Sequence, residues 1–150
     1  WVLQLVSDDV EWVSGFQVKN KQWKGYTNED HSEVSVKFKN GCEATVTISG
    51  MSMAPRPQWR ILGDRGSIES WDRQTYVINS LVNDRPMSAE VSSSAPNQSA
   101  ETYYRNICRH IQGRGRLSVT PESSARVIGV LEAANQSAAR GSQPIRPVFR

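Results

Sequence analysis

The fold is decided by one short stretch, residues 31–49, which reads HSEVSVKFKNGCEATVTIS. Apolar and polar residues alternate from Ser32 to Phe38 and again from Glu43 to Ser49, as they do in strands with one buried face. Between the two runs lies Asn40-Gly41. This pair is a strong hairpin signal, because both central residues of a type I′ turn need positive φ. The stretch therefore predicts an antiparallel hairpin.

Similar strand patterns occur on both sides of this hairpin. Further strands are expected at residues 10–19, 59–62, 67–71, 75–82 and 87–92. Gly63-Asp64-Arg65-Gly66 reads as a tight turn between two of them. Residues 20–30 and 51–58 have no period and read as loops, and the second contains Pro55 and Pro57, which cannot join the interior of a ladder.

After Ala95-Pro96 the hydrophobic period changes from two to about 3.6, which predicts helices. The first is expected from about residue 97 to 112, stopped by Gly113. The second begins at Thr120-Pro121-Glu122, where a capping hydroxyl, a fixed φ and a carboxylate suit a helix start. It should run to Arg140, closed by Gly141. Its predicted stripe consists of Ala125, Ile128, Leu131, Ala134 and Ala138.

Strands followed by helices indicate an α+β fold. We expect residues 1–150 to form one domain: a mostly antiparallel, open-faced sheet of about six to seven strands with two C-terminal helices packed on one face. The composition, 37% hydrophobic and 22% charged, is that of an ordinary globular domain. Two helices cannot cover both sides of the sheet, so the other face should meet solvent, a partner domain or a partner subunit.

Charge and hydropathy exclude several classes of partner. The net charge is +3 and the cations are spread among carboxylates, which predicts a mildly basic surface and no nucleic-acid partner. No stretch reaches the roughly 18 consecutive apolar residues needed to cross a bilayer, so no membrane partner is expected. Cys42 and Cys108 do not make a disulfide framework and are expected to be reduced thiols.

The search for catalytic side chains finds little. His31 and His110 have no second ligand at metal spacing, so no metal site is expected. The carboxylates of Asp8-Asp9, Glu29-Asp30 and Glu90 occupy turns or strand edges and are expected to be solvated.

The tryptophans divide into two groups. Trp12, Trp59 and Trp71 sit in predicted strands, where packing in a core or an interface is expected. Trp23 lies with Tyr26 in a loop, and these two are the better candidates for ligand binding.

Three segments together resemble the C-terminal domain of the glucose-fructose oxidoreductase / inositol dehydrogenase (Gfo/Idh/MocA) family. They are the hairpin from His31 to Val46, the stretch from Trp59 to Glu69 with its Gly-charged-x-Gly turn, and the closing helix from Thr120 to Gly141. Their order and spacing along the chain, rather than any one piece, carry the resemblance.

The resemblance implies a two-domain, NAD(P)-dependent oxidoreductase acting on a sugar, inositol or related polyol. NAD or NADP would be bound mainly by an N-terminal Rossmann domain, and the family's Glu-Lys-Pro lysine and downstream histidine precede the matching region. These 150 residues contain no counterpart of them, so no catalytic or cofactor-binding residue is carried over, and this segment alone is expected to be inactive. The start at Trp1 reads as a piece of a longer chain.

Partners and site residues also follow from the resemblance. The expected partners are the chain's own Rossmann domain, further copies bound through the open sheet face, and a small polyol, in a cytoplasmic protein whose export the sequence leaves open. The outward face, however, is more polar than an obligate interface should be. The two loops are expected to contribute substrate-lining residues: Trp23, Tyr26, Arg56 and Trp59.

Two alternatives remain open. The first is a non-catalytic module that stacks Trp23 and Tyr26 on carbohydrate. The second is a dimerisation domain with no ligand.

Overall fold

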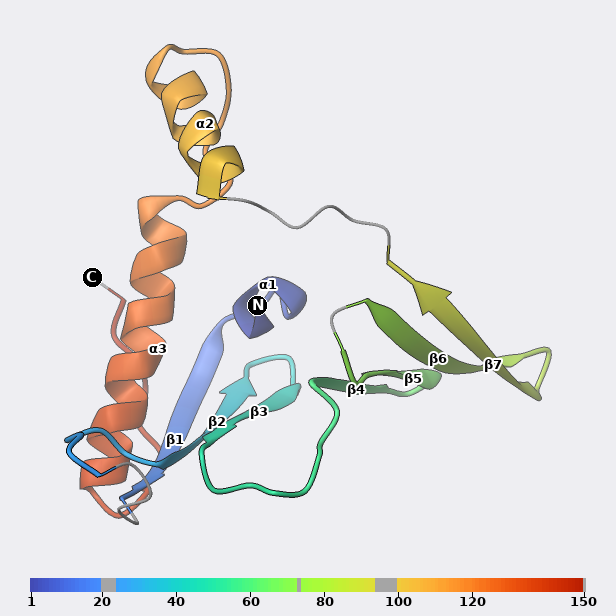
Figure 1. Ribbon diagram of the computed structural model, residues 1–150, viewed down its shortest axis with the longest axis horizontal. Helices are drawn as coiled ribbons and strands as arrows, with labels where there is room; N and C mark the ends of the chain where they lie inside the picture. The colour runs from blue at the N-terminus through green and yellow to red at the C-terminus, as the bar shows by residue number, and fades with distance from the viewer. Residues whose placement is uncertain (20–23, 73, 94–99, 150) are drawn as a thin grey trace. The chain divides into compact units, whose positions relative to one another are not determined.

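The computed structural model describes residues 1–19, 24–72, 74–93 and 100–149 (Figure 1). Its elements are α1 (Val2–Leu5), β1 (Val10–Val18), β2 (His31–Phe38), β3 (Glu43–Ser49), β4 (Trp59–Gly63), β5 (Gly66–Ser70), β6 (Thr75–Val82), β7 (Arg85–Ser92), α2 (Ala100–Ile111) and α3 (Pro121–Ala139). The chain forms two compact units, one of residues 1–52 with 109–150 and one of residues 53–108.

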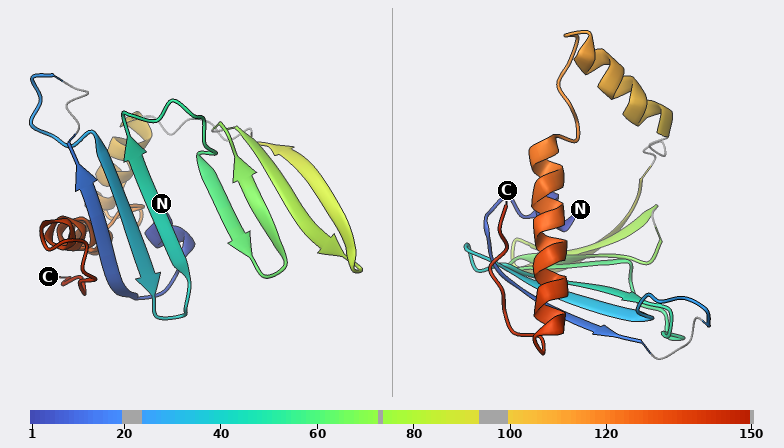
Figure 2. Two further views of the ribbon diagram at one scale, coloured as in Figure 1. Left: turned by 90° about the horizontal axis from the view of Figure 1, so that it is seen from below. Right: turned by 90° about the vertical axis from the view of Figure 1, so that its left-hand side faces the viewer.

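The first unit contains a three-stranded antiparallel sheet in the order β1-β2-β3, whose strands lie side by side in Figure 2. The register pairs Val13 with Val36 and Val36 with Ala44, so the apolar positions of all three strands share one face. At the free edge of β1, Ile145 and Val13 exchange two backbone hydrogen bonds of 2.8 Å. The C-terminal segment therefore protects this edge.

The core of the first unit lies between this sheet face and α3. Its buried side chains come from two sources, the strand residues Val10, Val13, Val36 and Phe38 and the helix residues Val130, Ala133 and Ala134. Gly15 permits the contact: a Cβ added there would lie 2.2 Å from the carbonyl oxygen of Ala134. Small residues at the interface therefore allow the strand and the helix to approach closely.

The helix α3 begins as predicted, but of its predicted stripe only Ala134 is fully buried. The Oγ1 atom of Thr120 accepts a hydrogen bond from the Ser123 N–H at 3.1 Å, and Gly141 has φ +69° after the helix end. The buried residues are Val130, Ala133, Ala134 and Ser137. Ile128 and Leu131, in contrast, are 63% and 50% exposed. Close packing against β1 therefore selects the small side chains over the large apolar ones.

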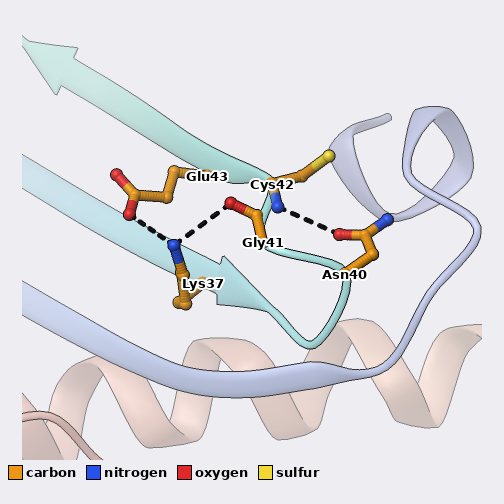
Figure 3. Close-up of polar contacts among 5 residues, drawn as sticks. All are labelled: Lys37, Asn40, Gly41, Cys42 and Glu43. Atoms are coloured by element: carbon orange, nitrogen blue, oxygen red, sulfur yellow. Dashed lines mark hydrogen bonds and ion pairs between the residues drawn. The ribbon is translucent and has the colours of Figure 1, made fainter.

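The predicted hairpin of β2 and β3 is confirmed, but its turn is not type I′ (Figure 3). Only Gly41 has positive φ, +90°. Its N–H donates to the Phe38 carbonyl at 3.0 Å, and the Asn40 side chain accepts from the Cys42 N–H at 3.0 Å. Lys37 Nζ donates to Glu43 Oε1 at 2.7 Å and to the Gly41 carbonyl at 3.1 Å. The turn is thus a longer one that ends in a left-handed glycine.

The second unit contains a four-stranded antiparallel sheet in the order β4-β5-β6-β7. Asn83 and Asp84 connect β6 to β7 with φ values of 50° and 59°. Positive φ at both positions is the feature of a type I′ turn, so this geometry occurs here rather than at Asn40-Gly41.

The α+β class and the seven antiparallel strands are confirmed. Two details differ from the sequence-based expectation. The strands form two sheets instead of one, and α2 has no buried residue, so of the two long helices only α3 shows a packed face. Over the described ranges, no helix is long and apolar enough to span a bilayer.

Candidate functional site

The predicted substrate-lining residues fall on two connections. Trp23 lies outside the described residues. Tyr26 is 69% exposed in the β1–β2 connection of the first unit. Arg56 is exposed in the connection that precedes β4, and Trp59 is the half-buried first residue of β4, both in the second unit. The exposure of Tyr26 and Arg56 suits ligand binding, and the substrate-lining role of all four residues stays a prediction.

The other tryptophans do not enter the core. Trp12 in β1 is half-buried, and Trp71, which follows β5, is 59% exposed. The first unit fills its core with small and β-branched side chains instead. Packing of these indole rings in an interface stays a prediction.

The histidines occupy structural positions. His31 begins β2, and its ring meets the Phe16 ring edge-on, with centroids 6.0 Å apart. His110 Nδ1 lies 2.9 Å from the carbonyl oxygen of Gly115, in the turn after α2. Within the described part of the chain, no group of three or more His, Cys, Asp or Glu side chains could hold a metal ion. Cys42 and Cys108 are exposed free thiols.

The described residues do not fit a dinucleotide. Such a cofactor places its pyrophosphate where a parallel strand leads through a glycine-rich turn into a helix N-terminus. Here both sheets are antiparallel, and the turn between Gly63 and Gly66 joins β4 directly to β5. The described residues therefore lack the strand-turn-helix arrangement that holds a dinucleotide's pyrophosphate.

One carboxylate contradicts the prediction that all are solvated. Asp30 is 1% exposed, although its neighbour Glu29 is exposed. The backbone explains the burial: the Asp30 N–H donates to the Val18 carbonyl at 3.1 Å, and the Gly50 N–H donates to the Asp30 carbonyl at 2.8 Å. These bonds fix Asp30 between the ends of β1 and β3. No local sequence signal marks this burial, because the groups that bond Asp30 come from the ends of two other strands.

Asp9 shows the behaviour expected of a solvated carboxylate. Its Oδ2 accepts a hydrogen bond from Lys39 Nζ at 2.8 Å, and both side chains are more than half exposed. The hydrogen bond and the positive charge of Lys39 hold the pKa of Asp9 below its usual range.

Asp72 acts within a turn. Its Oδ1 accepts from the backbone N–H groups of Thr75 at 2.5 Å and Gln74 at 2.7 Å, which lowers its pKa. These hydrogen bonds fix the backbone at the start of β6. The role of the Asp72 carboxylate is therefore structural.

Solved structures share the fold at low sequence identity. A Bacillus subtilis protein named as an oxidoreductase is 18% identical with a TM-score of 0.80, matching 97% of this chain and 48% of its own. An NAD-binding protein from Listeria innocua is 21% identical with a TM-score of 0.77, matching 97% and 44%. The WlbA dehydrogenase from Bordetella pertussis, solved with NADH and UDP-GlcNAcA, is 18% identical with a TM-score of 0.66, matching 98% and 41%.

The chain thus spans somewhat less than half the length of these solved relatives. The comparison with curated proteins found no match. The sequence of residues 2–146 matches the family described as "Oxidoreductase family, C-terminal alpha/beta domain". That match covers nearly the whole chain and agrees with the α+β architecture, so the chain belongs to this Gfo/Idh/MocA oxidoreductase C-terminal domain family.

Proposed function

We propose that this chain is the substrate-facing and assembly domain of an NAD(P)-dependent oxidoreductase that acts on a sugar, inositol or related polyol. The observation that carries the proposal is the family match over residues 2–146. Two solved relatives support the choice of cofactor and substrate class. The Listeria innocua relative is an NAD-binding protein, and the Bordetella pertussis dehydrogenase was solved with NADH and a nucleotide sugar.

The proposed task of this domain is positioning. The chain's own N-terminal Rossmann domain would bind NAD or NADP and supply the catalytic groups. In the first unit, the connection before β2 would contribute Trp23 and Tyr26 to substrate binding. In the second unit, Arg56 before β4 and Trp59 at its start would contribute to substrate binding. Aromatic rings suit the apolar face of a sugar ring, and a guanidinium group suits hydroxyl or phosphate oxygens.

Assembly is the second part of the proposal. The outward face of the three-stranded sheet carries the cross-strand pairs Glu33–Thr47, Ser35–Thr45 and Lys37–Glu43. Further copies of the protein would contact this polar face, in a cytoplasmic enzyme. The polarity of this face counts against an obligate interface, so the proposed contact between copies is a specific but less apolar one.

The test uses the full-length protein with NAD or NADP and a panel of myo-inositol, glucose and UDP-GlcNAcA. We expect one of these substrates to produce reduced nicotinamide, and residues 1–150 alone to produce none. Tyr26→Ala in the full-length protein should raise the substrate KM without changing the KM for the cofactor. A full-length protein that oxidises none of the panel contradicts the proposal. Sugar affinity retained by residues 1–150 alone would instead favour the carbohydrate-binding module.

A further inference from the structure

A fully buried carboxylate lies at the base of the connection that carries Tyr26. The side chain of Asp30 is 0% exposed, and its residue immediately precedes β2. Removing a carboxylate from water is costly, so a buried carboxylate needs compensating charge and hydrogen bonds.

Lys19 provides part of the charge that compensates the buried carboxylate of Asp30, and it also bonds the backbone of the β1–β2 connection. Its Nζ lies 4.0 Å from Asp30 Oδ1 and donates a 2.5 Å hydrogen bond to the carbonyl oxygen of Asn28. Asn28 is two residues from Tyr26. Lys19 follows the last residue of β1, so this one ammonium group links the end of that strand, the buried carboxylate and the segment 24–30.

The backbone of Asp30 closes the same connection. Its N–H and carbonyl bond Val18 at the end of β1 and Gly50 just beyond β3. The backbone of Asp30 therefore ties the end of the segment that follows Tyr26 to both neighbouring strand ends.

The opposite end of the same two strands supplies a natural comparison. Asp9 precedes β1 and Lys39 follows β2, and their ion pair is shorter, 2.8 Å, but its side chains are 70% and 61% exposed. Exposed pairs of this kind contribute little, because water already solvates both charges. The two pairs thus join the same strands through the same kinds of charged group. They differ in the burial of the carboxylate, 0% against 70% exposed, and in the distance between the charges, 4.0 Å against 2.8 Å.

We infer that Asp30 and Lys19 are a positioning pair, which holds residues 24–30 in the conformation that presents Tyr26 to the substrate. A buried ion pair is rarely more stabilising than apolar residues of the same volume, so its effect is on which conformation the connection adopts. The inference rests on the proposed function, since it assigns to Tyr26 a place against the substrate. The pair would act through Tyr26 and not directly on the reacting atoms.

The experiment compares Asp30→Asn and Lys19→Met with the matched variants Asp9→Asn and Lys39→Met, all in the full-length protein. Asp30→Asn keeps the shape of the side chain and removes its charge. We expect both variants of the buried pair to raise the KM for the panel substrate about fivefold or more, with kcat and the cofactor KM within about twofold of wild type. Lys19→Arg should restore the KM, because it returns the charge.

Hydrogen exchange of the amides of residues 24–29 provides a readout that does not depend on activity. The buried-pair variants should exchange about tenfold faster there, while the exposed-pair variants match wild type. Lys19→Met keeps the inference testable if Asp30→Asn does not fold, since Lys19 is partly exposed.

The outcomes separate the two proposals. An active wild type whose buried-pair variants match the exposed-pair variants in KM and exchange overturns the inference and leaves the proposed function standing. A wild type inactive on the whole panel overturns the proposed function, and the substrate role of Tyr26 falls with it; faster exchange in Asp30→Asn would then support only the anchoring of residues 24–30. Equal losses of kcat and of cofactor affinity would show general damage to the fold and overturn the positioning role.

Discussion

At Gly15, β1 and α3 leave no space for a methyl group. The neighbour that a Cβ would meet is backbone, the carbonyl of Ala134, and it cannot turn away as a flexible side chain can. The Gly15 N–H also donates a 3.0 Å hydrogen bond to Ser137 Oγ. Gly15 thus sets the distance between the strand and the helix that enclose the core.

Gly15→Ala should therefore lower the free energy of unfolding by about 3 kcal/mol, the upper part of the usual cost of overpacking. Urea denaturation of residues 1–150, followed by circular dichroism, measures this. Gly115→Ala is the control, because that position has open space around it and no positive φ, and it should change stability by less than about 0.5 kcal/mol. Equal effects of the two substitutions would show that the strand and helix are not in close contact.

Asp30 shows the limit of sequence reading at the same scale. A carboxylate in a polar segment is usually solvated, and the sequence contains nothing local to oppose that expectation. The burial arises from Val18 and Gly50, which hydrogen-bond its backbone from two other strand ends. A property set by three chain segments cannot be predicted from one.

Among the elements, α3 has the best-defined start. Thr120 caps it through the 3.1 Å hydrogen bond to the Ser123 N–H. The pKa of Glu122 is held below its usual range, chiefly by its own backbone N–H and further by the Thr120 hydroxyl. Because the folded-state pKa is lowered, the stabilisation by Glu122 is present above the usual carboxyl pKa and is lost as the pH falls through the folded-state pKa.

Thr120→Ala should cost about 1 kcal/mol of unfolding free energy, because one backbone donor loses its partner. The same change should raise the pKa of Glu122 toward its usual value. Chemical denaturation and an NMR titration of the Glu122 side chain check the two effects. Thr120→Ser retains the hydroxyl and should leave both the unfolding free energy and the pKa of Glu122 unchanged. An unaltered Glu122 titration in Thr120→Ala would show that the Thr120 hydroxyl does not lower that pKa.

The elements were predictable where their signal is local. Alternation in residues 32–38 and 43–49 and the Thr120-Pro121 start gave the strands and the helix close to their observed bounds. The turn type at Asn40-Gly41 and the full set of buried residues of α3 were not predictable from the sequence. The turn depends on how Phe38 and Cys42 pair, and the helix face depends on the approach to Gly15, which favours Ala134 over the more apolar Leu131.

At the scale of the whole molecule, the core is unevenly distributed. Every buried hydrophobic residue among those described belongs to the first unit. In the described part of residues 53–108 the one buried residue is Ser70. The register nevertheless aligns Ile61, Ile68 and Ile78 on one face of the four-stranded sheet, so that sheet has an apolar face without a buried core. The sequence predicted these strands, but alternation alone could not show how little of that face is covered.

Strands without a buried core should open more readily than strands with one, since local opening costs less where few apolar side chains are buried. We therefore expect the backbone amides of β4–β7 to exchange with solvent about a hundredfold faster than those of β1 and β2 in residues 1–150, as measured by native-state hydrogen exchange. The measurement is repeated at two protein concentrations. Exchange in β4–β7 that slows as concentration rises would mean that a second copy covers the apolar face, whereas equal protection of both sheets at every concentration would contradict the prediction, because it would require a core within the second unit.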